Sequence, residues 1–257
     1  FAEHVPANVP KVVVYPFAGG DLSTALTVYP DAHEITTLSL EPAGDPRALA
    51  KLDKRQLRVA LAIVATELSS LYRANFSVTL EMMSSMRAGA LPTQLIFSLS
   101  ALWLHGYEPV SLHYFQLTKD GELHYLTDDD LARIDKIHDL RKRNRELANI
   151  ELHFRKVGST HEQVYRHIMA NLDDAHLKAS PGPLRYLESK GQVEAMTMAA
   201  SYLLAFDGFQ TMRQYVIDHV VWMASDVTGL PPTYGTPAGF SYETYGTFLG
   251  PNQKSGT

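Results

Sequence analysis

One stretch, residues 11–45, constrains the fold more strongly than any other part of this 257-residue sequence. Its β-branched run at residues 12–14 is typical of a buried parallel strand. Gly19 and Gly20 follow the run and allow a tight turn with close backbone approach. Residues 22–29 are then long enough for two turns of helix. This order predicts the first half of a βαβ unit.

The same stretch continues with a second apolar run at residues 35–40, and Glu41 comes directly after it. In a βαβ unit the carboxyl ends of both strands meet at one edge of the sheet, so we expect Glu41 and the glycine turn to lie close together. A glycine loop at a helix N-terminus, with an acid at the tip of the next strand, is the arrangement that binds nucleotides. Residues 11–45 therefore predict a small-molecule site of nucleotide type.

Composition removes several other classes of protein. The formal net charge of −5 indicates no general surface for nucleic acid. The absence of cysteine excludes disulfides, thiolate metal sites and a cysteine nucleophile. No apolar run approaches the roughly 20 residues of a membrane helix, so no membrane span is expected. The chain begins with Phe1 rather than methionine, which indicates removal of a preceding segment and makes an exported protein one expectation.

The chain after the opening stretch divides into helical and hairpin-rich parts. Apolar residues recur with helical spacing over residues 47–72 and 76–86, and Thr93 is expected to cap a helix that runs to Leu104. Residues 108–172 are rich in hairpin signals. Their predicted strands are residues 110–117, 122–126, 150–157 and 162–169, and the charge-dense segment between the two pairs, residues 128–149, is predicted to be one solvated helix.

The final third is predicted to be mainly helical and then loop-rich. Residues 181–191 predict a short helix, residues 192–206 a buried helix or a helix followed by a strand, and residues 209–224 an amphipathic helix. Residues 251–257 are expected to be a disordered tail. Together these elements predict a single α/β domain over residues 1–250, with a Rossmann-like three-layer core, a mainly parallel sheet and an antiparallel hairpin extension.

The turn after the first strand reads YPFAGGD, residues 15–21. It resembles the first motif of class I S-adenosylmethionine-dependent methyltransferases, in which a strand runs into a Phe-Ala-Gly-type loop. In that family an acid on the second strand bonds the ribose hydroxyls, and Glu41 stands 22 residues after Gly19, near the spacing of about 20 expected for such an acid. The resemblance implies S-adenosylmethionine as the cofactor, with its binding residues at Phe17, Gly19, Gly20, Asp21 and Glu41.

Some positions depart from the pattern of that family. Tyr15 and Pro16 stand where the family usually has an acid, and Asp21 stands where it has a second glycine. Asp21 places negative charge near the N-terminus of the predicted helix. This favours a ligand that presents a cation, a sugar or a hydroxyl over a phosphate, or else a simple capping role for Asp21. The Pro-Pro-Tyr catalytic motif of amino-methyltransferases is also absent.

Two further hypotheses follow from the last part of the chain. His219 lies on the apolar stripe of its predicted helix and Asp226 follows in a polar loop, and a histidine oriented by a carboxylate is a common general base. A hydrolase that uses His219 and Asp226 is therefore one alternative. The opening turn and the stretch from Asp226 to Pro231 also resemble, more faintly, an uncharacterised family of exported bacterial proteins. That resemblance implies no activity, and it implies an exported protein. Together with the missing catalytic motif, the absent second glycine and the start at Phe1, it makes an exported binding or structural protein that has lost the ancestral chemistry the other alternative.

The leading hypothesis is a protein that binds a nucleoside or nucleotide-type small molecule on a methyltransferase-like fold, with a transferase as the candidate activity. The expected site is the crevice at the carboxyl ends of the first two strands, with Asp226 as an additional partner.

Overall fold

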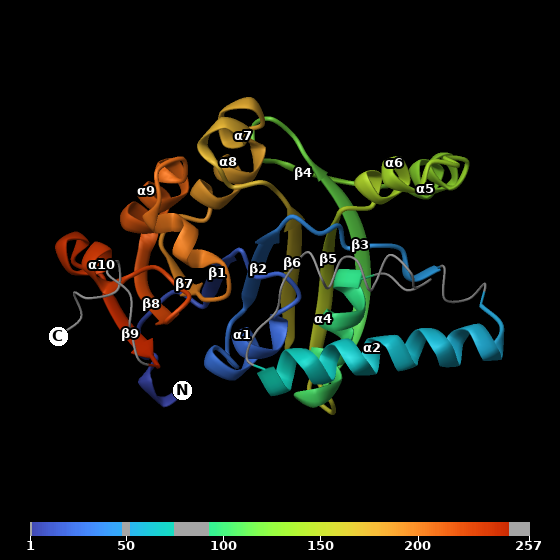
Figure 1. Ribbon diagram of the computed structural model, residues 1–257, viewed down its shortest axis with the longest axis horizontal. Helices are drawn as coiled ribbons and strands as arrows, with labels where there is room; N and C mark the ends of the chain where they lie inside the picture. The colour runs from blue at the N-terminus through green and yellow to red at the C-terminus, as the bar shows by residue number, and fades with distance from the viewer. Residues whose placement is uncertain (1, 48–51, 75–92, 247–257) are drawn as a thin grey trace.

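The computed structural model describes residues 2–47, 52–74 and 93–246. The chain is built around one sheet of nine strands. The strands are β1 Val12–Pro16, β2 Glu34–Ser39, β3 Tyr107–Leu117, β4 Leu123–Tyr125, β5 Asn149–Lys156, β6 Glu162–Met169, β7 Val193–Thr197, β8 Val220–Asp226 and β9 Ser241–Tyr245. They lie in the order β4-β3-β5-β6-β2-β1-β7-β8-β9 (Figure 1).

The sheet has a parallel part and an antiparallel part. Strands β6, β2, β1, β7, β8 and β9 pair in parallel. Strands β5 and β6 pair antiparallel, as do β3 with β5 and β3 with β4. The predicted α/β class, the mainly parallel sheet and the antiparallel hairpin extension are therefore confirmed.

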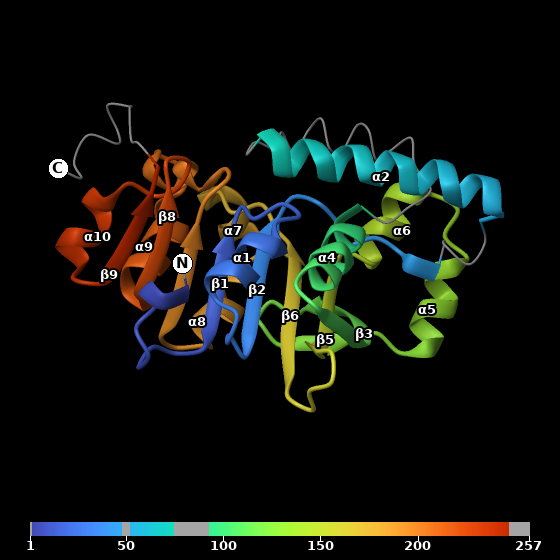
Figure 2. The ribbon, with the colours of Figure 1, turned by 90° about the horizontal axis from the view of Figure 1, so that it is seen from below.

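Helices cover both faces of the sheet (Figures 1 and 2). Alternate residues of β1 point to opposite faces, so Val13 packs with α1 and α4 whereas Val14 packs with α7, α8 and α9. The helices are α1 Leu22–Val28, α2 Lys54–Ala74, α4 Thr93–Leu104, α5 Asp128–Asp135, α6 Leu140–Glu146, α7 Asp174–Ala179, α8 Gly182–Glu188, α9 Gln210–His219 and α10 Pro232–Ala238, with 3-10 turns η1 Ala2–His4 and η3 Ser201–Ala205. Figure 2 shows α2 lying beyond α4, outside the two helix layers.

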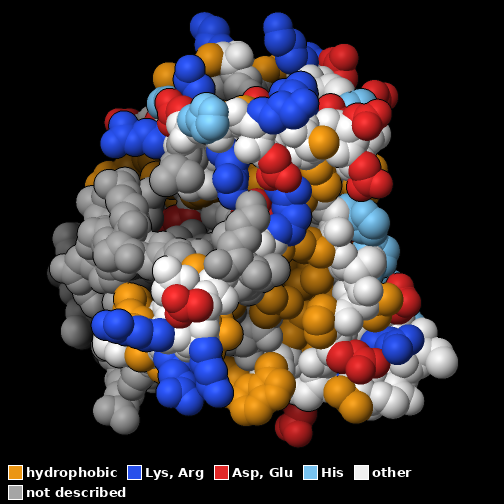
Figure 3. Space-filling view, turned by 90° about the vertical axis from the view of Figure 1, so that its right-hand side faces the viewer, with side chains coloured by type: hydrophobic (Ala, Val, Ile, Leu, Met, Phe, Trp, Pro, Cys, Tyr) orange, Lys and Arg blue, Asp and Glu red, His pale blue; other side chains and the backbone are white. Residues whose placement is uncertain are grey.

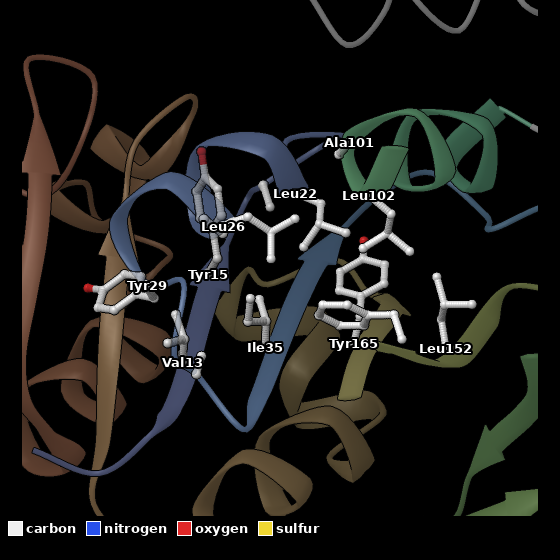
Figure 4. Close-up of a cluster of buried hydrophobic side chains, with 14 of the residues drawn as sticks. Val13, Tyr15, Leu22, Leu26, Tyr29, Ile35, Ala101, Leu102, Leu152 and Tyr165 are labelled. Atoms are coloured by element: carbon white, nitrogen blue, oxygen red, sulfur yellow. The ribbon is translucent and has the colours of Figure 1, made fainter. Parts of the chain in front are cut away.

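The core under α1 and α4 holds the opening βαβ unit together. Leu22 and Leu26 of α1 lie over Val13 and Ile35, and all four side chains are at most 1% exposed (Figure 4). Burial of this size contributes roughly 1.5–3 kcal/mol for each large apolar side chain, which is why the short helix α1 is stable in this position. The expected strand, glycine turn, helix and strand are all present, and the expected helix ending at Leu104 is α4.

Two predictions for the final third were wrong. Residues 192–206 form β7 followed by η3, and residues 209–224 form the shorter helix α9 followed directly by β8. The reason is pairing with the parallel sheet: residues 193–197 of β7 and 220–225 of β8 hydrogen-bond with each other. Buried parallel strands are apolar on both faces, so they lack the alternation that separates a strand from a buried helix in sequence.

The charge-dense segment also differs from its prediction. Residues 128–149 contain two helices, α5 and α6, because Asp139 caps a new helix by accepting hydrogen bonds from the backbone amides of Arg141 and Lys142. Figure 3 shows acidic and basic side chains interspersed over the upper part of this side of the molecule, which includes α5 and α6. The helix predicted at 76–86 and the tail at 251–257 lie outside the described residues. Among the described helices, none combines the length and apolar character needed to cross a membrane.

Candidate functional site

The order of the parallel strands reverses between β1 and β7. From β1 the chain proceeds outward to β2 and β6, and it then returns to the other side of β1 to form β7, β8 and β9. The loops that leave β1 and β7 therefore lead to opposite faces of the sheet, and the crevice between them is where open α/β sheets bind ligands. The glycine turn predicted from the sequence lies at this point. The candidate site is built from the loops that follow β1, β2, β7 and β8.

Two non-glycine residues at this crevice have left-handed backbone conformations. Phe17 follows β1 with a φ of 57°, and Ala199 follows β7 with a φ of 58°. Such a conformation costs roughly 1–2 kcal/mol for a residue with a Cβ, and strained residues of this kind cluster at active sites and ligand clamps. The Ser201 hydroxyl donates to the Pro16 carbonyl at 2.9 Å, which ties the two loops together. The chain therefore holds a strained geometry on both sides of the strand-order reversal.

The two glycines of the turn have different roles. A Cβ on Gly20 would lie 3.1 Å from Phe97 of α4, so the glycine allows the Phe97 side chain to pack closely against the turn. Gly19 has a φ of +55° and open space where its Cβ would be. Gln94 of α4 also donates to the Gly19 carbonyl oxygen. Among the described residues, α4 therefore fills the side of the turn at Gly20 and leaves the Cβ position of Gly19 open.

Asp21 is the N-cap of α1 and is half-buried. Its Oδ1 accepts from the Thr24 backbone amide at 3.1 Å and from the Thr24 hydroxyl at 2.7 Å, and its Oδ2 accepts from the Tyr15 hydroxyl at 3.1 Å. Figure 4 shows the Tyr15 hydroxyl pointing away from the core. Burial raises the pKa of the Asp21 carboxyl to about 6, nearby Asp226 adds to the increase, and hydrogen bonds from Thr24 and Tyr15 oppose it. Asp21 therefore has the capping role predicted as one of its alternatives, and these three hydrogen bonds leave about one of the four acceptor sites of its carboxylate unused.

Asp226 ends β8 and brings a second carboxylate to the crevice. Its Oδ1 accepts from the backbone amide and hydroxyl of Thr228, at 2.8 and 2.6 Å. The following loop is pressed against the end of β7, since a Cβ on Gly229 would lie 1.8 Å from the Thr197 carbonyl oxygen. Asp226 is close enough to affect the ionisation of both Asp21 and Tyr15. The structure thus brings together Asp21 and Asp226, which are far apart in the sequence.

Glu41 is buried beyond the end of β2, with 6% of its surface exposed. Its Oε2 has no hydrogen-bond partner among the described residues. Its backbone carbonyl accepts from His167 Nε2 at 2.7 Å, and Thr37 contacts both the His167 ring and the Tyr165 hydroxyl. Burial lowers the pKa of His167 to about 4, so this ring is neutral near pH 7. The predicted acid at the tip of the second strand is present, and its carboxylate has hydrogen-bonding capacity to spare.

Several residues of this region were not predicted from the sequence. The places of Gln94 and Phe97 depend on how α4 packs, and that of His167 on how β6 packs. In the sequence, His167 is marked by its place in the strand predicted at residues 162–169. The structure does not bring His219 and Asp226 together. His219 ends α9, and its Nδ1 donates to the Gly191 carbonyl oxygen at 2.9 Å. Asp226 ends β8, which is seven residues long, so the two side chains lie about 20 Å apart. The proposed His219–Asp226 pair is therefore wrong.

Within the described ranges, this region offers no set of metal ligands. The part of the chain that the structure describes contains no group of three histidine, cysteine, aspartate or glutamate side chains placed to hold a metal ion. Comparison of the chain with protein-family models, curated proteins and solved structures finds no match.

Proposed function

We propose that the crevice between β1, β7 and β8 binds a nucleoside or nucleotide-type small molecule on a Rossmann-like, methyltransferase-like scaffold. The parallel strands support this proposal because, renumbered along the chain, the order β6-β2-β1-β7-β8-β9 becomes 3-2-1-4-5-6. That is the order found in dinucleotide-binding folds, in which the ligand lies at the reversal next to strand 1.

The observation that carries the proposal is the pair of carboxylates, Asp21 and Asp226, at this reversal. Carboxylates accept hydrogen bonds from hydroxyl and ammonium groups and repel phosphates. Glu41 adds a buried oxygen without a partner among the described residues. These groups favour a ligand with ribose hydroxyls and a positive charge, and S-adenosylmethionine combines both. Methyl transfer is the candidate reaction for a protein that binds this cofactor.

A second candidate function rests on α4. Phe97 and Gln94 occupy one side of the glycine turn, and such filling is expected of a scaffold that has kept the fold and closed part of an ancestral site. A binding or structural protein without methyl-transfer chemistry is therefore the alternative. The two candidates predict different results in a binding experiment.

Isothermal titration at pH 7.5 with S-adenosylmethionine, its demethylated product and NAD tests the proposal. We expect saturable binding of S-adenosylmethionine and weaker binding of NAD, because NAD carries two phosphates. Asp226→Asn removes the charge with little change of shape and is expected to weaken S-adenosylmethionine binding about tenfold or more. Asp139→Asn makes the same change at the exposed cap of α6 and is expected to leave binding unchanged.

The absence of binding heat for all three compounds, in a sample that unfolds cooperatively, would contradict the proposal and favour the alternative. Binding of NAD tighter than that of S-adenosylmethionine would contradict the role assigned to the two carboxylates.

A further inference from the structure

A hollow lies at the amino edge of the sheet, opposite the edge that carries Asp21 and Asp226. It has a volume of about 550 Å³ and lies between the N-terminal loop and the starts of β7, β8 and β9. The residues that line it are apolar, or polar and uncharged, and they include Val9 from the loop and Gln192, Trp222 and Ser241 from the sheet side. Because these residues precede or begin their strands, the hollow is separate from the crevice of Asp21 and Asp226.

A buried carboxylate lies next to this lining. Glu194 of β7 is in register with Val13 on one side and Trp222 on the other, and it follows Gln192 by two residues. Cross-strand partners share a face of the sheet, so the pairing of Glu194 with Trp222 places Glu194 next to a residue that lines the hollow. Glu194 is 1% exposed, and its Oε2 has no hydrogen-bond partner among the described residues.

The groups around Glu194 leave its charge poorly compensated. Burial raises the pKa of Glu194 to about 7, and Lys11 opposes this shift from a position outside hydrogen-bond contact with Oε2. Tyr29 faces it from the end of α1, but the Tyr29 hydroxyl donates to the Ala195 carbonyl at 2.5 Å. Tyr245 of β9 lies near Tyr29 as well. An ionised carboxylate in this setting calls for a cation, because buried charges are normally paired.

We propose that this hollow binds an organic ammonium ion with an apolar body, with its cationic group against Trp222 and its charge balanced by Glu194. Trp222 lines the hollow and its ring meets Tyr29 edge to face at 5.7 Å between centroids, so its position is fixed. Tryptophan is the aromatic side chain that attracts cations most strongly. Neighbouring strands lie about 4.8 Å apart, so a cation at Trp222 is within short electrostatic range of Glu194.

The two tryptophans of the sequence make this proposal measurable. Trp103 is 78% exposed and Trp222 is 3% exposed, so Trp103→Phe leaves Trp222 as the single fluorescent reporter. In this background at pH 8, titration with 2-phenylethylammonium is expected to change Trp222 emission in a saturable manner. Neutral 2-phenylethanol has nearly the same shape and is expected to bind about tenfold more weakly or worse.

Two variants separate Glu194 from general surface charge. Glu194→Gln is expected to fold, since it removes a buried charge, and to weaken 2-phenylethylammonium binding about tenfold or more. Glu243→Gln removes a carboxylate from the adjacent strand β9, where Glu243 contacts His4, and is expected to bind as the unmodified protein does. A thermal melt at pH 8 provides the second measurement: 2-phenylethylammonium is expected to raise the Tm of the Trp103→Phe protein and not that of its Glu194→Gln derivative.

Three results would overturn the proposal. They are the absence of any saturable change in emission, equal affinity for the ammonium and the alcohol, and equal affinity of the proteins with and without Glu194. Because the hollow and the crevice lie at opposite edges of the sheet, none of these results depends on whether S-adenosylmethionine binds.

Discussion

The ionisation of Glu194 makes a quantitative prediction about stability. The pKa of this carboxyl is raised from an ordinary value of 4.5 to about 7 because the residue is buried. Between these two values the native state keeps a proton that the unfolded chain releases, so stability falls as pH rises from 4.5 to 7. The full loss, present above pH 7, is about 3 kcal/mol, since each pKa unit corresponds to about 1.4 kcal/mol.

Glu194→Gln removes this penalty while keeping the size and polarity of the side chain. Urea unfolding of both proteins at pH 5 and pH 8, in a buffer without organic amines, gives the free energy of unfolding at each pH. We expect the stability of the variant relative to the unmodified protein to be higher at pH 8 than at pH 5 by about 2–3 kcal/mol. The difference in free energy of unfolding between variant and unmodified protein is taken at each pH. The contributions of all other titrating groups cancel in this difference, provided that the dependence on urea concentration is the same for both proteins.

The control is Glu122→Gln, at an exposed position after the turn between β3 and β4. It removes one carboxylate without affecting the core, and its effect on stability is expected to be the same at both pH values. If the relative stability of Glu194→Gln were also independent of pH, the reasoning would be refuted, because Glu194 would then ionise in the native state as easily as in the unfolded chain.

Three further predictions concern other parts of the core. Burial lowers the pKa of His167 from 6.5 to about 4, so the free energy of unfolding falls as pH drops through this range. Between pH 7 and pH 4.5 the unmodified protein is expected to lose up to about 3 kcal/mol for this reason, and His167→Gln is expected to abolish that loss in urea unfolding. Arg166 pairs with two carboxylates in a mostly buried network, so Arg166→Met should lower the free energy of unfolding by about 3 kcal/mol or more. Arg185 belongs to an exposed pair, so Arg185→Met should lower it by less than about 1 kcal/mol. Equal losses for the two arginine variants would contradict the role of burial. Gly229→Ala places a Cβ 1.8 Å from a backbone oxygen and should cost more than about 2 kcal/mol in the same assay. Gly19→Ala strains the left-handed backbone and should cost about 1–2 kcal/mol. A smaller loss at Gly229 than at Gly19 would show that the loop of Gly229 can move.

Much of the opening βαβ unit could be predicted because its signals are local. A β-branched run, a pair of glycines and a second apolar run each restrict the backbone over a few residues, and β1, α1 and β2 form where they were expected. The same applies to the hairpin of β5 and β6, whose alternating residues flank a short turn. The predictions for β7 and β8 were wrong, because burial on both faces of a parallel strand removes the alternation on which such predictions depend.

The candidate site divides in the same way. The sequence alone determined that a glycine turn follows the first strand, that an acid follows the second, and that Asp21 stands at a helix start. Only the tertiary structure decided that Asp226 lies beside Asp21, that α4 fills the side of the turn at Gly20, and that Glu194 is buried next to Trp222. The physical reason is that turn geometry and capping depend on neighbours within a few residues, whereas burial, register and ionisation depend on side chains brought together from distant parts of the chain.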